Sequence, residues 1–211
     1  MLTAIIDYSS GNLHSAQKAF EKITASNNLG SVVVTSDPKI ISSADRLVLP
    51  GDGAFPSCKA ELMSSEAYEA MVYSTVEKSR PFLGICVGMQ LMATKSYEHQ
   101  ETEGLDWIDG EVQKINPKDK SLKIPHMGWN TLNIESEHPV LNSINNGDHV
   151  YFVHSFQMIL KKQEQRLAHT DYGTDITAVV GKDNMVGLQF HPEKSGQTGL
   201  KMIENFLSWR P

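Results

Sequence analysis

The chain has 211 residues, of which 40% are hydrophobic and 21% are charged, an ordinary composition for a globular protein. Its formal net charge is -6 and it has no stripe of basic residues. Both features argue against nucleic-acid binding. No stretch has the roughly 18 apolar residues of a membrane span, and the first residues lack a signal-peptide pattern. The two cysteines, Cys58 and Cys86, share no metal-ligand or redox spacing, so we expect a reducing, cytoplasmic compartment and no metal.

Short apolar strands alternate with helix-like segments in the first half of the chain. Apolar residues recur at helical spacing between Leu13 and Ile23, whereas runs such as Val32 to Val34 are typical of strands. The predicted order is strand 2–6, helix 13–23, strands 32–34 and 46–49, helices 54–63 and 67–78, strand 81–85 and helix 87–93. This alternation is typical of a parallel sheet that is covered on both faces.

The second half of the chain reads mainly as strands separated by turn signals such as Asn146-Gly147 and Asp183-Asn184. Strands are predicted at 110–115, 129–134, 150–156, 166–170, 177–180 and 185–190, followed by a closing helix at 198–209. There is no internal repeat and no linker. We therefore expect residues 1–211 to form one α/β domain, an open and mostly parallel sheet with an antiparallel addition.

Gly84-Ile85-Cys86-Val87-Gly88 is the most informative pentapeptide, because it follows a predicted strand and precedes a predicted helix. Glycine on both sides of a nucleophile at such a junction is the pattern of a nucleophile elbow. The turn pushes Cys86 out at the carboxyl end of its strand, and the helix N-terminus favours the thiolate. The alternative is a small buried hydrophobe, which is how we interpret Cys58.

His191-Pro192-Glu193 at the end of a predicted strand supplies a base and a residue to orient it. Residues two apart in an extended chain point to the same side, so Glu193 can hold the imidazole of His191 as acids do in other triads. Nothing in the spacing proves that His191 meets Cys86. The other histidines, including His126 and His154, form no metal-ligand motif.

Leu49-Pro50-Gly51-Asp52-Gly53 ends another predicted strand and is a candidate oxyanion loop. Acyl transfer through a thiolate needs preorganised N–H donors. In elbow enzymes one donor follows the nucleophile, which is Val87 here, and the other comes from a strand-end loop, here Gly51 to Gly53. A plain turn remains the alternative for this segment.

Taken together, these segments resemble the class I (triad) glutamine amidotransferases and, among them, the glutaminase subunits of imidazole glycerol phosphate synthases of histidine biosynthesis. The resemblance runs nearly end to end. It is carried by Gly84 to Gln90 and 189–193, and by Asp7-Tyr8, 11–13, 49–51, 124–130, 151–156 and 191–195. It implies the flavodoxin-like fold of that family, L-glutamine as substrate and no cofactor. It also implies a heterodimer with a (β/α)8-barrel cyclase subunit that receives the ammonia.

The resemblance assigns further roles residue by residue. Its implied glutamine-binding residues are Gln90 and Glu98 for the amino-acid end, with the backbone N–H groups of Ser155 and Phe156 for the carboxylate. Its implied partner-facing residues are Asn12, Trp129, Asn130, Tyr151 and Lys194.

Two positions depart from the family pattern. Asp52 stands where the family usually has an apolar residue, and Gly196 where it often has Gln. A carboxylate near a developing oxyanion is unfavourable by roughly 1 kcal/mol or more if it is poorly solvated. We therefore expect the side chain of Asp52 to point outward.

The resulting hypothesis is a glutaminase in which Cys86 forms a γ-glutamyl thioester and His191, held by Glu193, moves the protons. We expect a poor glutaminase until a partner aligns the oxyanion loop. Three alternatives stay open at this point: the glutaminase of another pathway, a stand-alone cysteine peptidase or γ-glutamyl hydrolase, and a non-catalytic binding module.

Overall fold

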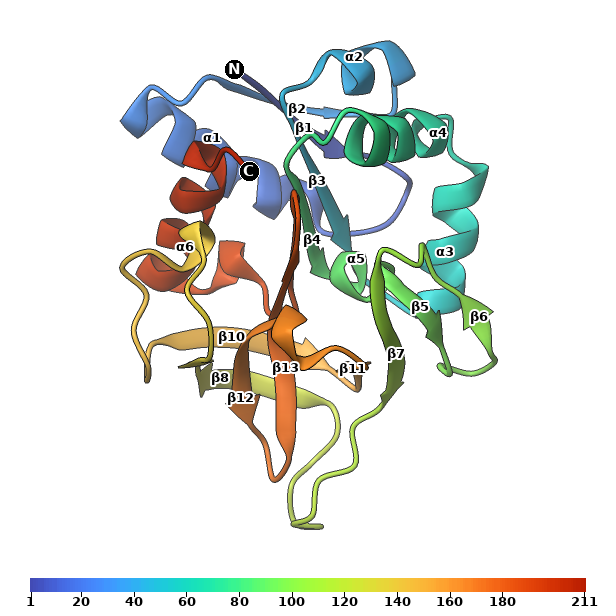
Figure 1. Cartoon of the computed structure of the whole chain (residues 1–211), viewed down its shortest axis with the longest axis vertical. Coiled ribbons are helices and arrows are strands. Elements are labelled where there is room, and N and C mark those ends of the chain that lie inside the picture. The colour runs from blue at the N-terminus through green and yellow to red at the C-terminus, as the bar shows by residue number, and fades with distance from the viewer.

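A computed structural model describes residues 1–211 and has one large mixed sheet at its centre (Figure 1). In spatial order its strands are β2 (Ser31–Thr35), β1 (Leu2–Ile6), β3 (Arg46–Gly51), β4 (Phe82–Cys86), β14 (Met185–Leu188), β13 (Asp175–Lys182), β12 (Arg166–Asp171) and β9 (Asn133–Ile134). The first five run parallel, and β13, β12 and β9 pair antiparallel. The predicted sheet with its antiparallel addition is confirmed, and the order β2-β1-β3-β4-β14 is that of flavodoxin-like folds.

Helices cover both faces of the parallel strands, as strands that are apolar throughout require. In Figure 1, α1 (Leu13–Asn27) and α6 (Gly196–Ser208) pack together on one side. On the other side lie α2 (Pro38–Ser43), α3 (Phe55–Ser64) and α4 (Ala67–Val72), which continues into a π-helical turn at Tyr73–Glu77. The unpredicted α2 had a signal in the sequence, because Asp37 caps it by accepting from the Lys39 N–H and Pro38 opens it. No helix has the length and apolar character that crossing a membrane requires.

Two small antiparallel-rich sheets lie beyond the carboxyl ends of β3 and β4, in the lower part of Figure 1. One has the order β11 (Phe156–Leu160), β7 (Ile108–Lys114), β5 (Ala93–Ser96) and β6 (Thr102–Glu103). The other pairs β10 (His149–His154) with β8 (His126–Thr131). Short 3-10 turns lie at Pro139–Leu141, Gln163–Gln165 and Pro192–Lys194. These sheets place residues from the second half of the chain over the strand ends of the first.

Three predicted elements were wrong in extent. The helix predicted at 87–93 is only α5 (Val87–Gln90), because the chain enters β5 at Ala93 and pairs there with β7. The strand predicted at 129–134 breaks at Leu132, where pairing passes from β10 to β12. The strand predicted at 150–156 breaks at Ser155, where the chain crosses from one small sheet to the other. In the two strands apolar residues recur on both sides of the break while the pairing partner changes.

The turn after β4 depends on backbone contacts that leave no room for side chains. A Cβ on Gly88 would lie 1.9 Å from the Leu49 carbonyl oxygen, and one on Gly84 would lie 2.6 Å from the Gly88 carbonyl oxygen. Both neighbours are backbone atoms, which cannot move aside as a flexible side chain can. The glycines are therefore required by the close packing of β3, β4 and α5.

We expect Gly88→Ala to destabilise the fold by more than about 3 kcal/mol, measured as the free energy of unfolding in urea. Gly147→Ala is the matched control, because Gly147 has φ of 91° but open space where a Cβ would lie. The free energy of unfolding of that variant should fall only by the cost of the backbone strain, about 1–2 kcal/mol. Equal losses in the two variants would show that the close approach at Gly88 is unimportant.

Candidate active site

Cys86 ends β4 and precedes α5 with φ of 54° and ψ of -112°. A positive φ is strained for a residue other than glycine, and such strain tends to gather at functional sites. The side chain is buried. The predicted elbow geometry is thus present: a buried thiol on a strained turn between a strand and a helix.

His191 and Cys86 reach the same edge of the sheet because their strands are neighbours. β14 runs parallel to β4 with Leu188 opposite Ile85, so both chains leave the sheet at the same level. The Nδ1 atom of His191 lies 2.8 Å from Oε1 of Glu193, and its Nε2 atom is buried without a hydrogen-bond partner. The structure therefore brings the three predicted triad residues together.

The protonation of His191 reflects these neighbours. Burial by itself would lower its pKa, but the interactions of the ring with the nearby Cys86 and Glu193 side chains raise the pKa to about 10. The imidazole is therefore charged at neutral pH. A charged imidazole beside a thiol can stabilise the thiolate and can also donate a proton to a leaving group.

Gln189 joins the site although the sequence reasoning assigned it no role. It is fully buried, and its Nε2 lies 3.8 Å from the Cys86 sulfur. The Nε2 of Gln90 donates to Oε1 of Gln189 and to the Phe156 carbonyl, both at 3.0 Å. The available signal was a polar residue ending an apolar strand just before His191. Gln90 is thus connected to the cysteine through a neutral amide.

A cavity of about 220 Å³ opens in front of Cys86, smaller than the roughly 300–1,000 Å³ of typical ligand pockets. Its walls bring together residues from five regions of the chain: Asp52, Gly53, Cys86, Val87, Gln90, Glu98, Pro125, Val153, His154, Ser155 and Phe156. The predicted substrate residues Gln90, Glu98, Ser155 and Phe156 all line it. Glu98 accepts a 2.7 Å hydrogen bond from the Phe55 N–H at the start of α3.

The predicted oxyanion loop forms one rim of this cavity. Gly51 stands opposite Cys86 in the β3–β4 pairing, and Gly53 has φ of 120°. The Tyr8 hydroxyl donates to the Pro50 carbonyl and the Ser10 hydroxyl donates to the Asp52 carbonyl, both at 2.8 Å. The Asp52 side chain is exposed, so water can solvate its charge.

Part of the predicted partner face is assembled next to His191. Trp129 stands opposite Tyr151 across β8 and β10, with ring centroids 6.0 Å apart, and Trp129 is 56% exposed. Lys194 is exposed on the turn that follows His191. Asn130 is directed to the other side of β8, because neighbouring residues on a strand alternate. There it donates to the Asp171 carbonyl at 2.8 Å.

The last of the predicted partner-facing residues, Asn12, caps a helix. Its side chain accepts from the Ser15 N–H at 3.2 Å at the start of α1. Helix α1 packs against the turn at Pro192–Lys194. Asn12 therefore lies on an element that contacts the segment carrying Lys194.

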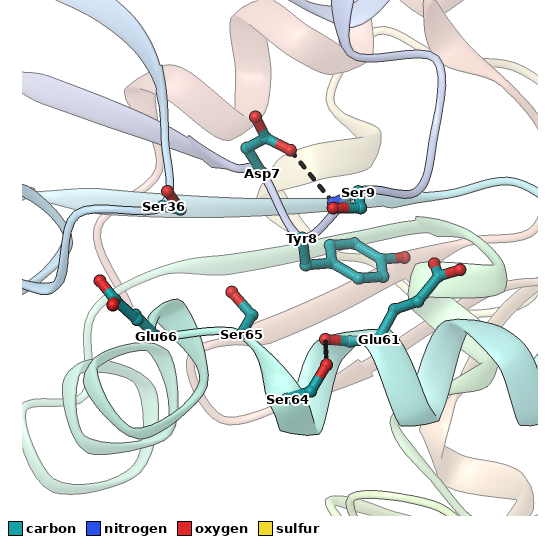
Figure 2. A pocket seen from close by; sticks show the side chains of 8 residues that line it. All are labelled: Asp7, Tyr8, Ser9, Ser36, Glu61, Ser64, Ser65 and Glu66. Atoms are coloured by element: carbon teal, nitrogen blue, oxygen red, sulfur yellow. Dashed lines mark hydrogen bonds between the residues drawn. The ribbon is translucent and has the colours of Figure 1, made fainter.

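A second hollow of about 300 Å³ lies at the carboxyl ends of β1 and β2 (Figure 2). Carboxylates, hydroxyls and one ring line it: Asp7, Tyr8, Ser9, Ser36, Glu61, Ser64, Ser65 and Glu66. It contains neither a thiol nor an imidazole, and the chain has no group of three or more His, Cys, Asp and Glu placed to hold a metal. The cavity at Cys86 is the candidate site for covalent chemistry, because its thiol adjoins the His191–Glu193 pair.

Comparisons with known proteins show the family of the chain. The family model described as glutamine amidotransferase class-I matches residues 4–209. The imidazole glycerol phosphate synthase subunit HisH of Ruegeria pomeroyi is 60% identical and that of Cereibacter sphaeroides 56% identical, each over 100% of both chains. A solved glutamine amidotransferase from Thermotoga maritima superposes with a TM-score of 0.61 at 18% identity, over 94% of this chain and 78% of that one. At that identity the structural likeness concerns the fold alone.

We expect the His191 ring to stay protonated up to about pH 10, compared with about 6.5 for an ordinary histidine. Cys86→Ala should lower this pKa, because the nearby Cys86 side chain contributes to the shift. NMR titration of the ring signals measures it, with Cys58→Ser as a control because the Cys58 sulfur contacts Ser10 instead.

The same shift has a consequence for stability. Because the folded pKa lies above the unfolded value, the stabilisation from the charged ring is fully present below about pH 6.5 and is lost as the pH rises through 10. A ring that titrates near pH 6.5 in the unmodified protein would contradict the proposed pairing with Cys86.

Proposed function

Since the chain belongs to the class-I glutamine amidotransferase family, we propose that it is the glutaminase subunit of an imidazole glycerol phosphate synthase in histidine biosynthesis. Its reaction is the hydrolysis of L-glutamine to glutamate and ammonia. The observation that carries the proposal is the strained Cys86 turn facing a His191–Glu193 pair in a small cavity. The full-length identity of 60% to a subunit of that synthase supports the choice of pathway.

The first half of the reaction forms a thioester. The Cys86 thiolate attacks the carboxamide carbon of glutamine, and the carbonyl oxygen becomes an oxyanion. The Val87 N–H and the loop from Gly51 to Gly53 are the proposed donors to that oxygen. The charged His191 then gives its proton to the leaving nitrogen, so that ammonia departs as the C–N bond breaks.

The second half returns the enzyme to its starting state. The neutral His191 takes a proton from water, and the resulting hydroxide attacks the thioester carbon. Glutamate leaves as the C–S bond breaks, which regenerates the thiolate beside a charged imidazole. Glu193 holds the ring in one tautomer and stabilises its charge throughout, because the contact to Nδ1 leaves Nε2 for the reacting groups.

We propose that the cavity binds the amino-acid end of glutamine through Glu98, Gln90 and the Ser155–Phe156 backbone. One oxygen of Glu98 is engaged by the Phe55 N–H, and the other is suited to the substrate ammonium. The backbone N–H groups of Ser155 and Phe156 are suited to its carboxylate. A volume of about 220 Å³ favours a free amino acid over a peptide.

We propose a heterodimer with a (β/α)8-barrel cyclase subunit in the cytoplasm, with residues 1–211 acting as one unit. Ammonia released into water would largely protonate and lose its nucleophilic lone pair, so a sealed path to a second active site is required. Exposed aromatic and thioether side chains next to the His191 turn, Trp129 and Met127, support a protein contact here. The partner would use the ammonia to form imidazole glycerol phosphate and an aminoimidazole carboxamide ribotide.

We expect Cys86→Ala to reduce glutamate release by at least about 10³-fold, because the covalent step is lost. Release of glutamate from glutamine, measured with the cyclase partner present, checks this. Cys58→Ser is the matched control and should stay active, since serine can keep the hydrogen bonds to Ser10 and the Asp52 carbonyl. Unchanged release by Cys86→Ala, or a glutamine-analogue label on Cys58, would refute the proposal.

We expect Trp129→Ala to weaken binding of the cyclase subunit by about 30-fold or more, as loss of a central aromatic contact typically costs at least 2 kcal/mol. Isothermal titration calorimetry with the purified cyclase measures it. Tyr73→Ala is the control, because Tyr73 is similarly exposed at 49% but lies in the π-helical turn after α4. Equal loss in both variants would place the interface elsewhere.

A further inference from the structure

Two buried histidines beside the cavity have no role in the proton transfers described above. His126 and His154 stand opposite each other in the β8–β10 pairing and are 2% and 6% exposed. The Nδ1 atom of His126 lies 3.0 Å from Nε2 of His154. His126 is also sandwiched between the rings of Phe152 and Tyr172, with centroids 4.7 and 4.0 Å away.

These two rings belong to one line of hydrogen bonds that ends on the substrate cavity. The Nδ1 atom of His154 lies 2.8 Å from the Phe156 carbonyl oxygen. At the other end, Nδ2 of Asn130 lies 3.3 Å from Nε2 of His126 and donates to the Asp171 carbonyl. The line therefore runs from the backbone at Asp171 to the backbone at Phe156.

Only one arrangement of protons satisfies every bond in this line. A carbonyl oxygen can only accept, so Nδ1 of His154 donates to Phe156 and its Nε2 must accept. Nδ1 of His126 then donates to that Nε2, which leaves Nε2 of His126 to accept from the amide of Asn130. The carbonyl at Phe156 thus determines the tautomer of both rings.

The rings are uncharged, as this arrangement requires. Burial lowers the pKa of His126 to about 4. Burial also lowers the pKa of His154, and the nearby His126 and His191 rings lower it further. The hydrogen bond to Phe156 raises this pKa, but the result is still about 3. A proton on Nε2 of His154 would face the N–H of His126 and break the line.

The Phe156 carbonyl is held from two sides. It accepts from Nδ1 of His154 and from Nε2 of Gln90, which uses both of its lone pairs. The neighbouring Ser155 carbonyl accepts from the Ile115 N–H at 2.9 Å. That bond makes Phe156 and Lys114 a non-hydrogen-bonded pair of β11 and β7. The N–H of Phe156 therefore turns away from β7, toward the same side as its carbonyl and the cavity.

We propose that His126 and His154 are positioning residues that hold the Ser155–Phe156 backbone in the orientation that binds the carboxylate of glutamine. This inference rests on the proposed glutaminase function and adds two residues to it. They touch no reacting atom and act through the Phe156 carbonyl. Without them, this segment, which lies at the junction of the two small sheets, loses one of its two side-chain anchors.

Steady-state glutaminase kinetics of the full chain with its cyclase partner test this directly. His154→Leu should raise KM for glutamine by roughly 10-fold or more, as expected for loss of alignment of a hydrogen bond to a charged group, with a much smaller change in kcat. His154→Asn should recover most of the KM, because the amide nitrogen of Asn can occupy the place of Nδ1 and donate to Phe156.

His138→Leu is the matched control. Burial lowers the pKa of His138 too, but the ring packs on Trp209 and accepts from the Val140 N–H, away from the cavity. Its KM should stay that of the unmodified protein. An unchanged KM in His154→Leu, or an equal rise in His154→Asn and His154→Leu, would overturn the inference while leaving the glutaminase function intact. Absence of glutaminase activity in the unmodified complex would overturn both.

A second measurement does not depend on activity or on the folding of a variant. Long-range ¹H–¹⁵N NMR of the unmodified protein should show both rings neutral and protonated at Nδ1 at pH 7. A signal from a His154 ring protonated at Nε2 would contradict the donor direction toward Phe156 and overturn the inference, whatever the kinetics show.

Discussion

The parallel pairing of β4 with β14 is the constraint on which the candidate site depends. These strands are about one hundred residues apart in the chain, yet Leu188 lies directly opposite Ile85. Because parallel strands end at the same edge, Cys86 and His191 emerge together, and Gln189 reaches the sulfur from the next strand. A slip of one residue in this register would turn the side chains to opposite faces. The position of Cys86 relative to His191 therefore depends on the register of the β4–β14 pairing.

The electrostatics of the site are divided between charged and neutral groups. The His191 ring carries a positive charge at neutral pH, because the nearby Cys86 and Glu193 side chains raise its pKa against the effect of burial. Around them the polar groups are neutral: the amides of Gln189 and Gln90, and the rings of His154 and His126. A second positive charge on His154 would oppose the imidazolium of His191. Burial that keeps the outer rings uncharged thus avoids repulsion of the charged His191 ring.

Strand β10 connects the exposed face to the cavity. The N–H of Tyr151 donates to the hydroxyl of Ser195, which itself donates to the His191 carbonyl, and the His191 N–H donates to the Tyr151 carbonyl. On the same strand, His154 holds the Phe156 carbonyl. Strand β10 therefore contacts the proposed partner surface, His191 and the Phe156 carbonyl. The proposed contact at Trp129 and Tyr151 is therefore close to His191, whose N–H donates to the Tyr151 carbonyl.

Local pattern in the sequence was enough to predict the sheet class, the elbow at Cys86 and the pairing of His191 with Glu193. Each of these depends on residues close in the chain: glycines that a tight turn requires, and two side chains at i and i+2 of an extended segment. The resemblance added Gln90, Glu98, Ser155 and Phe156, which the structure gathers around one cavity. Their roles remain proposals.

What only the tertiary structure decided is which distant segments meet. The strand breaks at Leu132 and Ser155 arise from a change of pairing partner, which leaves no mark in the local apolar pattern. Gln189, His126 and His154 lie in segments that carry the resemblance, but spacing alone assigned them no role, because the bonds that orient them come from other strands. Asn130, next to Trp129 in sequence, faces the other way because strand residues alternate. Steric constraints within a turn depend on residues that are adjacent in the sequence, whereas hydrogen-bond partners across the sheets are determined only when the chain packs.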